Sequence, residues 1–389
     1  MQHKPPPIIQ IVLTLLILLC ATAPAASYPY VAISPAKEVT PVKIDGTIHP
    51  DAEWEDAVVL SGFIQRDLDL IAPLPSQPVV FLKVDAENLY LAMRSPVGPE
   101  GTEELRAFEK SRDAWKGIME GDHAVLELAP VSTRSRGDLT DLGYFRLVWN
   151  AVGGLADSHR DFAPGQKGQG WTSGATLANS VTAGHWDTEL KIPLDNLLSY
   201  VYERRNAIPP AHRTYWSFSI SRRFGEEGGN LFSTWDATPL LEDAGGYPRK
   251  YDLVPRKAML RFIRNTVHTR LHTLGPIAEG RFHPRLTFHN PTDTPHTVQI
   301  ATRITNEDKA PIYQHATTIE VPPGQTATAE GFDAELNPEM GKLHLQLRIR
   351  QDARWTILST PPMPLRAFDA ELHQQYLRSM RLLREERLP

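Results

Sequence analysis

The sequence predicts an all-β chain, in which an antiparallel β-sandwich is followed by a second, smaller sandwich and a C-terminal helix. Apolar and polar residues alternate in many short stretches, at the two-residue period of a half-buried strand. Turn-forming residues separate these stretches, and the chain has 33 prolines and 25 glycines among its 389 residues. Helical periodicity is confined to a few short segments, so strands are expected to build both sandwiches.

The N-terminus has the pattern of a secretory signal peptide, predicted over residues 1–26. His3 and Lys4 precede an apolar stretch at 8–20, and small residues follow at 23–26. This stretch is shorter than the roughly 20 residues of a membrane-spanning helix, so no transmembrane anchor is expected after cleavage. Lipidation of Cys20 is an alternative that the bulky residue before it disfavours. The protein is therefore expected in the periplasm or outside a bacterial cell.

Composition excludes several classes of function. Cys20 is the only cysteine, so the mature chain has no disulfide scaffold, no thiolate metal site and no cysteine nucleophile. The net charge is −5, and no basic stretch is interleaved with aromatic residues. Nucleic acid is therefore not an expected partner.

The first sandwich is predicted over residues 38–256. Asp45-Gly46 is a tight-turn pair, and Trp54 follows it on a short segment that resembles a lid. Further along, one face of each alternating stretch is apolar, which is typical of an antiparallel sandwich. The stretches that predict strands are residues 79–84, 89–94, 121–130, 144–154, 185–194 and 215–224.

The second sandwich, predicted over residues 260–365, is expected to be immunoglobulin-like. Its clearest strand is KLHLQLRIR, in which Leu343, Leu345, Leu347 and Ile349 alternate with polar residues and are expected to point inward. The tail at 366–389 has an apolar stripe at helical spacing, so it is predicted to be a helix that docks on the protein or on a protein partner.

Motifs of hydrolases and metalloenzymes are weak. His268 and His272 share a face only on a helix, whereas the local alternation favours a strand and disfavours a metal site. Glu127 and Glu189, on neighbouring predicted strands, are the candidate carboxylate pair for a glycosidase. Cross-strand ion pairs with Arg146 or Lys191 are the simpler interpretation. The glycine-rich stretch at 165–174 lacks the residues of a phosphate loop.

Tryptophan is the more informative residue, because the chain has eight. The flat C–H faces of sugars stack on indole rings, while sugar hydroxyls need polar side chains nearby. Trp54, Trp186 and Trp216 have apolar neighbours and are expected in the core. Trp115 and Trp171 lie in polar loops and are the candidates for a sugar platform.

Seven segments, in order, resemble the pattern of the family 9 carbohydrate-binding modules and of the wider superfamily of that fold. The resemblance covers about residues 40–255, and the segments are IDGTIHPDAEWEDA, VVFLKVDAENLYLAMRS, GDHAVLELAP, YFRLVWNAVGGLADS, the lone Trp171, WDTELKIPLDNL and WSFSISRRF. It implies a sugar-binding jelly roll, usually appended to xylanases and other polysaccharide hydrolases. It also implies that Trp54 is structural.

The same resemblance assigns site residues unevenly. Trp171 matches a binding aromatic, Arg222 matches an arginine after the late strand, and Glu189 matches an acid. Val125 stands where the family has an acid, which places an intact sugar site in doubt.

Family members also often hold structural calcium. The candidate ligands are Asp85, Glu87 and Asn88, although a plain turn explains all three.

These observations predict an exported, non-catalytic carbohydrate-binding protein, with an expected accessory role in xylan-type polysaccharide degradation. The residues expected to contact a polysaccharide or oligosaccharide are Trp171, Trp115, Arg222, Arg146, Asn150 and Glu189. One alternative is an envelope structural or interaction protein with a degenerate sugar site. Another is a b-type haem protein of the same fold, with axial ligands from Met93, Met119 and His123.

Overall fold

The computed structural model describes most of the two predicted sandwiches. The described residues are 30–35, 39–67, 70–73, 77–97, 105–131, 144–160, 167–168, 171–182, 184–197, 215–226, 229–234, 258–337, 341–351, 354–359 and 363–364. The predicted signal peptide and the predicted tail helix lie outside them. Within the described residues, no helix has the length and apolar character needed to cross a membrane.

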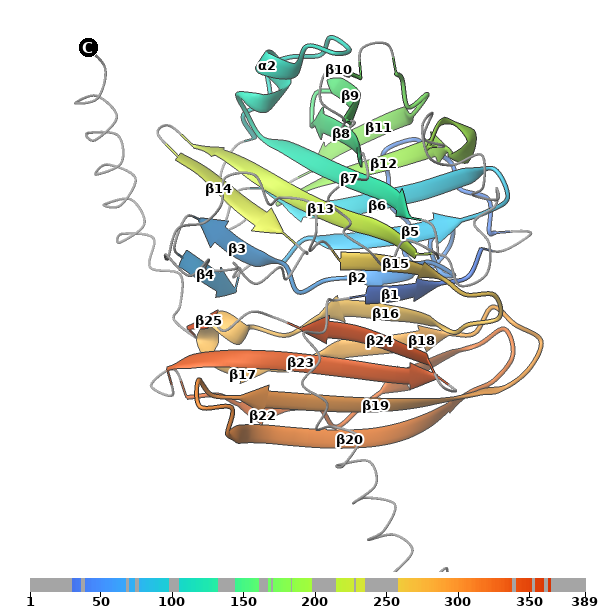
Figure 1. Cartoon of the computed structure of the whole chain (residues 1–389), viewed down its shortest axis with the longest axis vertical. Coiled ribbons are helices and arrows are strands. Elements are labelled where there is room, and N and C mark those ends of the chain that lie inside the picture. The colour runs from blue at the N-terminus through green and yellow to red at the C-terminus, as the bar shows by residue number, and fades with distance from the viewer. Residues whose placement is uncertain are drawn as a thin grey trace, which may run out of the picture.

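Two large sheets lie against each other, and the prediction of an all-β sandwich architecture is confirmed (Figure 1). We name the 15-stranded sheet A and the eight-stranded sheet B. In spatial order, the main path of sheet A is β10 (Lys167–Gly168), β9 (Leu155–Arg160), β8 (Tyr144–Asn150), β7 (His123–Val131), β13 (Tyr215–Glu226), β15 (Ala258–Phe262), β1 (Tyr30–Ile33), β24 (Arg354–Ser359), β23 (Lys342–Gln351), β19 (His296–Thr305) and β20 (Pro311–Val321).

Side branches complete sheet A, and sheet B is simpler. The branches of sheet A are β14 (Gly229–Thr234), β3 (Ile64–Asp67), β4 (Leu70–Pro73) and β25 (Met363–Pro364). The order of sheet B is β11 (Thr176–Thr182), β12 (His185–Pro193), β6 (Asn88–Pro96), β5 (Val79–Val84), β2 (Val58–Leu60), β16 (His268–Thr273), β18 (Arg285–His289) and β21 (Thr326–Ala329). The remaining elements are α2 (Trp115–Met119), two 3₁₀ helices, η3 (Leu194–Leu197) and η4 (Ile277–Glu279), and the pair β17 (Arg281–Phe282) and β22 (Ala334–Glu335).

Both sheets run without a break through the two predicted sandwiches. In sheet A, β1 pairs in parallel with β15 and antiparallel with β24, so the first strand joins the two halves. In sheet B, β2 pairs in parallel with β16 through Val59 and Arg270. The boundary near residues 256–260 stays a prediction, but hydrogen-bonded ladders cross it on both layers.

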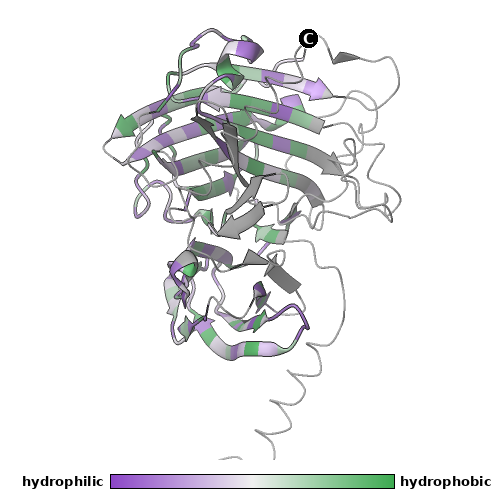
Figure 2. Ribbon diagram, turned by 90° about the vertical axis from the view of Figure 1, so that its left-hand side faces the viewer, coloured by the Kyte–Doolittle hydropathy of each residue, from purple (hydrophilic) through white to green (hydrophobic). Residues whose placement is uncertain are grey.

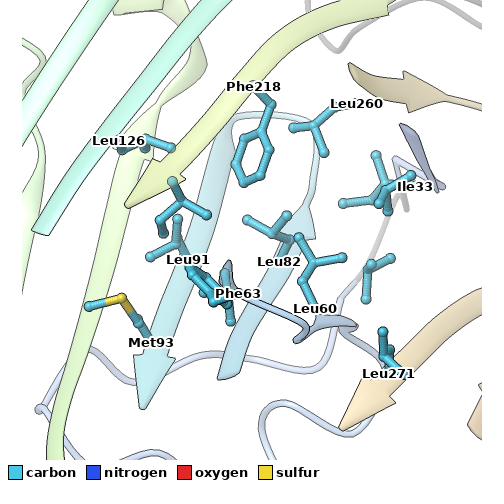
Figure 3. Packing of buried hydrophobic residues seen from close by; sticks show 14 of the residues in the cluster. Ile33, Leu60, Phe63, Leu82, Leu91, Met93, Leu126, Phe218, Leu260 and Leu271 are labelled. Atoms are coloured by element: carbon cyan, nitrogen blue, oxygen red, sulfur yellow. The ribbon is translucent and has the colours of Figure 1, made fainter. Parts of the chain in front are cut away.

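The alternation seen in the sequence sets which side chains enter the core. Phe218 and Leu126 of sheet A point toward Leu82 and Leu91 of sheet B (Figure 3). Apolar and polar residues alternate in colour along the strands (Figure 2). The expectation that three tryptophans belong to the core is confirmed, because Trp54 and Trp186 are 0% exposed and Trp216 is 5% exposed.

A segment that we name the lid, residues 39–57, covers the outer face of sheet B. Ile48 and Trp54 of the lid form a small apolar cluster with the outward residues Val59, Phe81 and Tyr90. These residues alternate with the inward ones, so the lid lies on the side of sheet B that faces away from sheet A. Sheet A has a shorter cover, because helix α2 packs on β8 and β9 through Ile118, and Ile118, Val148 and Ala156 are all 0% exposed.

Candidate functional site

The outward side chains of β13, β7, β8 and β9 form a surface that we name the open face. Leu126 and Leu128 of β7 and Phe145 and Leu147 of β8 point into the core, so their neighbours point outward. The register places Ser219, Glu127, Arg146 and Ser158 in one row across the four strands. The next row is Ser221, Val125, Val148 and Ala156.

Trp115 borders the open face from helix α2. Its indole is half-buried and packs on a small apolar cluster made by Ile118, Val148 and Ala156. Val125 packs on the same cluster. Ile118, Val148 and Ala156 are 0% exposed, whereas Val125 and Trp115 are half-buried. The valine that replaces the expected acid is therefore the partly exposed end of an apolar strip beside an indole, which suits the C–H face of a sugar better than its hydroxyls.

A polar row lies one step along the strands from this strip, about 7 Å away. Arg146 Nε donates to Glu127 Oε1 at 2.8 Å, and Arg146 Nη2 lies 2.5 Å from the same oxygen. The two side chains are 29% and 14% exposed. This confirms the predicted cross-strand pair. The pair still presents a guanidinium edge and a carboxylate, the groups that bind sugar hydroxyls.

Trp171 lies on the other side of strand β8. Its ring centre is 4.8 Å from that of Phe145, an inward residue, and 6.4 Å from that of His159. Its Nε1 donates to the carbonyl of Asn196 at 2.7 Å. Trp115 contacts outward residues of the same strand, so the two indoles do not face each other across a common ligand.

Arg222 is not available to a ligand, which corrects its assignment as a sugar contact. It is 0% exposed and lies between the sheets, with its guanidinium 4.9 Å from the centre of the Trp186 ring. It donates to Asp122 Oδ1 at 2.8 Å and to Ser95 Oγ at 3.0 Å. Burial lowers the pKa of Arg222, and Asp122 opposes this effect. The arginine is a structural ion of the core.

Asn150 is also structural, and its assignment is corrected for the same reason. It is 0% exposed. Its Nδ2 donates to the carbonyl of Glu109, and its Oδ1 accepts from Gly154 N, both at 2.8 Å. These bonds close the turn between β8 and β9 and hold the loop before α2. Asn150 therefore positions the helix that carries Trp115.

Glu189 anchors the lid and does not face a ligand, which corrects a third assignment. It is 0% exposed. One carboxylate oxygen accepts from Asp45 N at 3.0 Å and Gly46 N at 2.9 Å, and the other accepts from Trp54 Nε1 at 2.9 Å. Burial raises the pKa of Glu189, and the three donors oppose this effect. This acid is the reason that the Asp-Gly turn and Trp54 occur together.

The same placement removes the glycosidase hypothesis for this carboxylate pair. Glu127 points outward from sheet A, while Glu189 points outward from sheet B beneath the lid. Two carboxylates must flank one glycosidic bond to hydrolyse it. Two layers of packed side chains separate these two groups.

The candidate calcium ligands form an ordinary turn that does not fit the ion. Asp85 Oδ1 accepts from the backbone N–H groups of Glu87 and Asn88, at 2.7 and 2.6 Å, and Oδ2 accepts from Tyr90 OH at 2.9 Å. Among the described residues, no three acidic, histidine or cysteine side chains group closely enough to hold a metal.

The candidate haem ligands are not gathered around one cavity. Met93 lies in the core between the sheets, whereas Met119 packs on the cluster outside sheet A. His123 is buried, and its Nδ1 is 2.7 Å from the carbonyl of Gly121. These positions do not bring two axial ligands to one iron.

His268 and His272 lie on strand β16, as their alternation predicted, and each has a protein partner. His268 Nε2 accepts from Ser34 N at 3.1 Å, and its Nδ1 lies 2.6 Å from the carbonyl of Asp56. His272 Nε2 is 3.1 Å from Thr287 Oγ1. The pair thus joins the lid, β1 and β16.

Sequence reasoning missed the polar residues that complete the open face. Ser158 and Ser221 are half-buried outward residues of β9 and β13. Their signal was available, because both occupy the outward phase of strands whose inward phase is strongly apolar. Lys83 was also missed. It is 2% exposed and donates from the sheet to the lid carbonyls of Thr40 and Glu53, both at 2.8 Å.

No family model matches the chain, and no curated protein matches it in sequence. Among solved structures, it is similar to a candidate carbohydrate-binding protein from Bacteroides uniformis, at 12% identity and a TM-score of 0.42, over 61% of this chain and 100% of that one. It is also similar to a family 9 carbohydrate-binding module from Caldicellulosiruptor kristjanssonii, solved with cellotriose, at 12% identity and a TM-score of 0.36, over 61% of this chain and 95% of that one.

A third similarity is to an enzyme of which the chain covers a small part. A Bacteroides uniformis beta-glucuronidase aligns with 70% of this chain and 26% of its own length, at 9% identity and a TM-score of 0.18. The second of the three structures belongs to the family that the sequence resembles.

Proposed function

We propose that this chain is an exported, non-catalytic carbohydrate-binding protein that acts beside enzymes degrading xylan-type polysaccharides. The observation that carries the proposal is the open face. It places two half-buried apolar side chains, Trp115 and Val125, on one cluster, one row away from the Arg146–Glu127 pair. A sugar ring has the same two-sided chemistry, with C–H groups on its faces and hydroxyls around its edge.

The geometry also indicates the type of binding. The accessible groups on this face are few, since Arg146 is 29% and Glu127 14% exposed, and one indole lies beside them. A bound glycan would touch the protein on one side and stay largely in contact with water. Stacking on one aromatic ring is worth about 1 kcal/mol. Ordering a flexible chain and desolvating its hydroxyls offset part of that gain, so the affinity is modest. Weak, reversible binding suits a protein that holds a polysaccharide for a partner enzyme.

Affinity gels containing xylan and soluble β-glucan, followed by calorimetry with oligosaccharides, test this proposal. The wild type is expected to be retarded, and Trp115→Leu is expected to lose about fivefold in affinity, since leucine keeps the packing but not the stacking ring. Arg146→Ala is expected to lose less. Wild type that is not retarded by any glycan, or Trp115→Leu that binds like the wild type, would contradict the proposal.

Trp171→Leu is the matched control, because it removes an indole on the inward side of the same strand. Binding that is lost in this variant and kept in Trp115→Leu would move the site to the Trp171 edge. An assay for reducing sugars released from xylan should remain at background, as a non-catalytic role requires.

A second candidate function is an envelope interaction protein whose sugar site has been lost. The burial of Arg222, Asn150 and Glu189 favours it, because these residues cannot contact a glycan from the positions that they occupy. Pull-down from envelope extracts with the full chain and with a chain lacking residues 366–389 tests it. The interaction role predicts a partner captured by the full chain, and identical partners for both chains would exclude the tail from the contact.

A further inference from the structure

The segment before helix α2, residues 105–114, presents an aromatic ring to solvent, and we name it the arm. Burial alternates along its first half: the odd-numbered residues from 105 to 109 are half-buried, and the exposed ones are Arg106, Phe108 and Lys110. Among the described residues, Phe108 and Val181 are the two large apolar side chains that are exposed, at 75% and 53%. Single apolar residues are often exposed on protein surfaces, so the setting of this ring decides whether it has a role.

The backbone of the arm is fixed on both sides of Phe108. Before the ring, Arg106 N donates to Asp122 Oδ2 at 2.7 Å, and Asp122 N donates to the carbonyl of Arg106 at 2.6 Å. After the ring, the carbonyl of Glu109 accepts from Asn150 Nδ2 at 2.8 Å. Asp122 and Asn150 are 4% and 0% exposed, so both anchors belong to the interior. Phe108 therefore extends from a backbone that the folded protein has already ordered.

Two glycines allow the arm to lie this close to the sheet. A Cβ at Gly121 would lie 1.9 Å from the carbonyl oxygen of Arg106, and a Cβ at Gly154 would lie 2.4 Å from that of Glu109. Any larger residue at either position would have to move the arm. The position of Phe108 is thus set before a ligand arrives, which reduces the conformational entropy that binding costs.

The arm crosses one end of the open face. Asn150 follows Val148 by two residues on β8, so the row that anchors the arm lies about 7 Å beyond the apolar strip. The arm also borders α2, because a Cβ at Gly117 would lie 3.0 Å from the Cβ of Glu109. Helix α2 and the arm lie beside the same ends of β7 and β8 (Figure 1). A glycan that contacts Trp115 can therefore continue over the arm.

Two cations flank the ring. Arg106 and Lys110 are two residues before and after Phe108, on the same exposed side of the arm. Within the part of the chain that the structure describes, neither side chain has an ion pair or a hydrogen bond. The carboxylate between them in sequence belongs to Glu109, which lies against α2 and accepts from Ser111 N at 2.6 Å. The exposed side of the arm thus presents an aromatic face between two positive charges.

We propose that the arm is the part of the glycan site that takes an acidic sugar, with the Phe108 ring against the C–H face of a uronic acid and Arg106 or Lys110 on its carboxylate. This inference rests on the proposed function, because the open face selects a glycan among the anionic ligands. A guanidinium can hold a carboxylate through two parallel N–H donors. The charged neighbours of the ring suit a sugar better than a protein partner, whose hot spots need a desolvated apolar surround.

Affinity gels and calorimetry test this inference with a glucuronic-acid-substituted xylan and with the same polymer after reduction of its carboxyl groups. At low salt, the wild type is expected to bind the acidic polymer about fivefold more tightly than the reduced one. This preference should shrink at about 300 mM salt. Arg106→Gln/Lys110→Gln should lose the preference and bind the reduced polymer as the wild type does.

Substitutions of the ring test the stacking contact. Phe108→Leu should bind both polymers about fivefold more weakly, because leucine keeps an apolar group but removes the ring. Phe108→Trp should bind at least as tightly as the wild type. The melting temperature should stay unchanged in each variant of the arm, since the substituted side chains are exposed.

The matched control removes two positive charges elsewhere. Lys309 and Lys342 are exposed residues of the second sandwich, so Lys309→Gln/Lys342→Gln should bind both polymers as the wild type does. Equal losses in the control and in Arg106→Gln/Lys110→Gln, or equal binding of the two polymers by the wild type, would overturn the proposal. Equally tight binding of double-stranded DNA or of phosphatidylserine vesicles, lost in the same arm variant, would overturn the assignment to a glycan.

Trp115→Leu separates this inference from the proposed function. If it weakens the binding of both polymers while the variants of the arm bind like the wild type, the open face is supported and the arm has no role. If the variants of the arm lose binding while Trp115→Leu binds like the wild type, the arm is supported and the open face is contradicted.

Discussion

The two outer faces of the first sandwich carry similar charged residues, but these residues have different roles. On sheet B, the charged residues Glu189 and Lys83 point outward into the lid and are almost fully buried. On sheet A, Glu127 and Arg146 also point outward, but they pair with each other and stay partly exposed. A charged outward residue of a strand is therefore an anchor where a segment covers the sheet, and a candidate ligand contact where the sheet stays open.

Substituting the two glutamates tests this difference most directly. Glu189→Ala leaves the Gly46 N–H and the Trp54 indole N–H buried without this acceptor and removes one of the two acceptors of Asp45 N–H, so the free energy of unfolding should fall by about 3–5 kcal/mol. Glu127→Ala breaks a partly exposed pair and should cost less than about 1 kcal/mol. Urea unfolding followed by tryptophan fluorescence measures both. Equal losses would show that the two faces do not differ.

Two glycines with positive φ test how closely the lid turn is held against sheet B. Gly46 has φ +87°, and a Cβ there would lie 2.6 Å from the backbone carbonyl carbon of Asn179. Gly184 has φ +92°, but a Cβ there would meet nothing within 4 Å. Gly184→Ala should cost about 1 kcal/mol from backbone strain, and Gly46→Ala should cost about 1–3 kcal/mol more, because the lid must shift.

Thermal unfolding of the two alanine variants compares these costs. If Gly46→Ala is as stable as Gly184→Ala, the lid turn can move away from Asn179 without a loss of stability. The close approach to Asn179 would then not contribute to the attachment of the lid.

The stability of the face that the lid covers should also depend on pH. Burial lowers the pKa of His268 to about 4, below its ordinary value of 6.5, so protonation favours the unfolded chain. The stability contributed by neutral His268 is complete above about pH 6.5 and is lost as the pH falls toward 4. The loss is at most about 1.4 kcal/mol per pH unit. Protonation would also remove the acceptor for Ser34 N.

Urea unfolding between pH 7.5 and pH 4.5 measures this dependence. A His268→Gln variant should be less stable than the wild type at pH 7.5 and should lose less stability on acidification. His272 also titrates from a lowered pKa of about 4, so it provides the comparison. If the free energy of unfolding changes with pH by the same amount in the wild type and in His268→Gln, this pH dependence does not come from His268.

The strands were predictable because their signal is local. The alternation of Trp186, Leu190 and Ile192 with Asp187 and Glu189 gave the correct two faces of β12. What covers the second face is set by residues more than 100 positions away, such as the lid turn at 45–46. Alternation cannot distinguish water from a lid, so Glu189 was predicted as a ligand contact.

The predictions of the site residues divide in the same way, between those that a local pattern supports and those that depend on distant residues. Arg146 and Trp115 belong to the surface that the structure leaves open, and the pairing of Arg146 with Glu127 was expected from cross-strand chemistry. The assignment of Arg222 failed, because it was taken from the resemblance, whereas the alternation places Arg222 on the apolar face of its strand. An arginine in the apolar phase of a strand, here with Phe218 and Ile220, is the signal of a buried ion pair.

Strand β1 has a consequence for the mechanics of the molecule. Because Tyr30–Ile33 is hydrogen-bonded between β15 and β24, cutting the protein near residue 257 would leave bare edges on both halves. Unpaired strand edges recruit other chains, so separately expressed halves should aggregate. A pull applied to the C-terminal half is resisted by ladders in both layers. The two halves are therefore not expected to rotate freely about a linker.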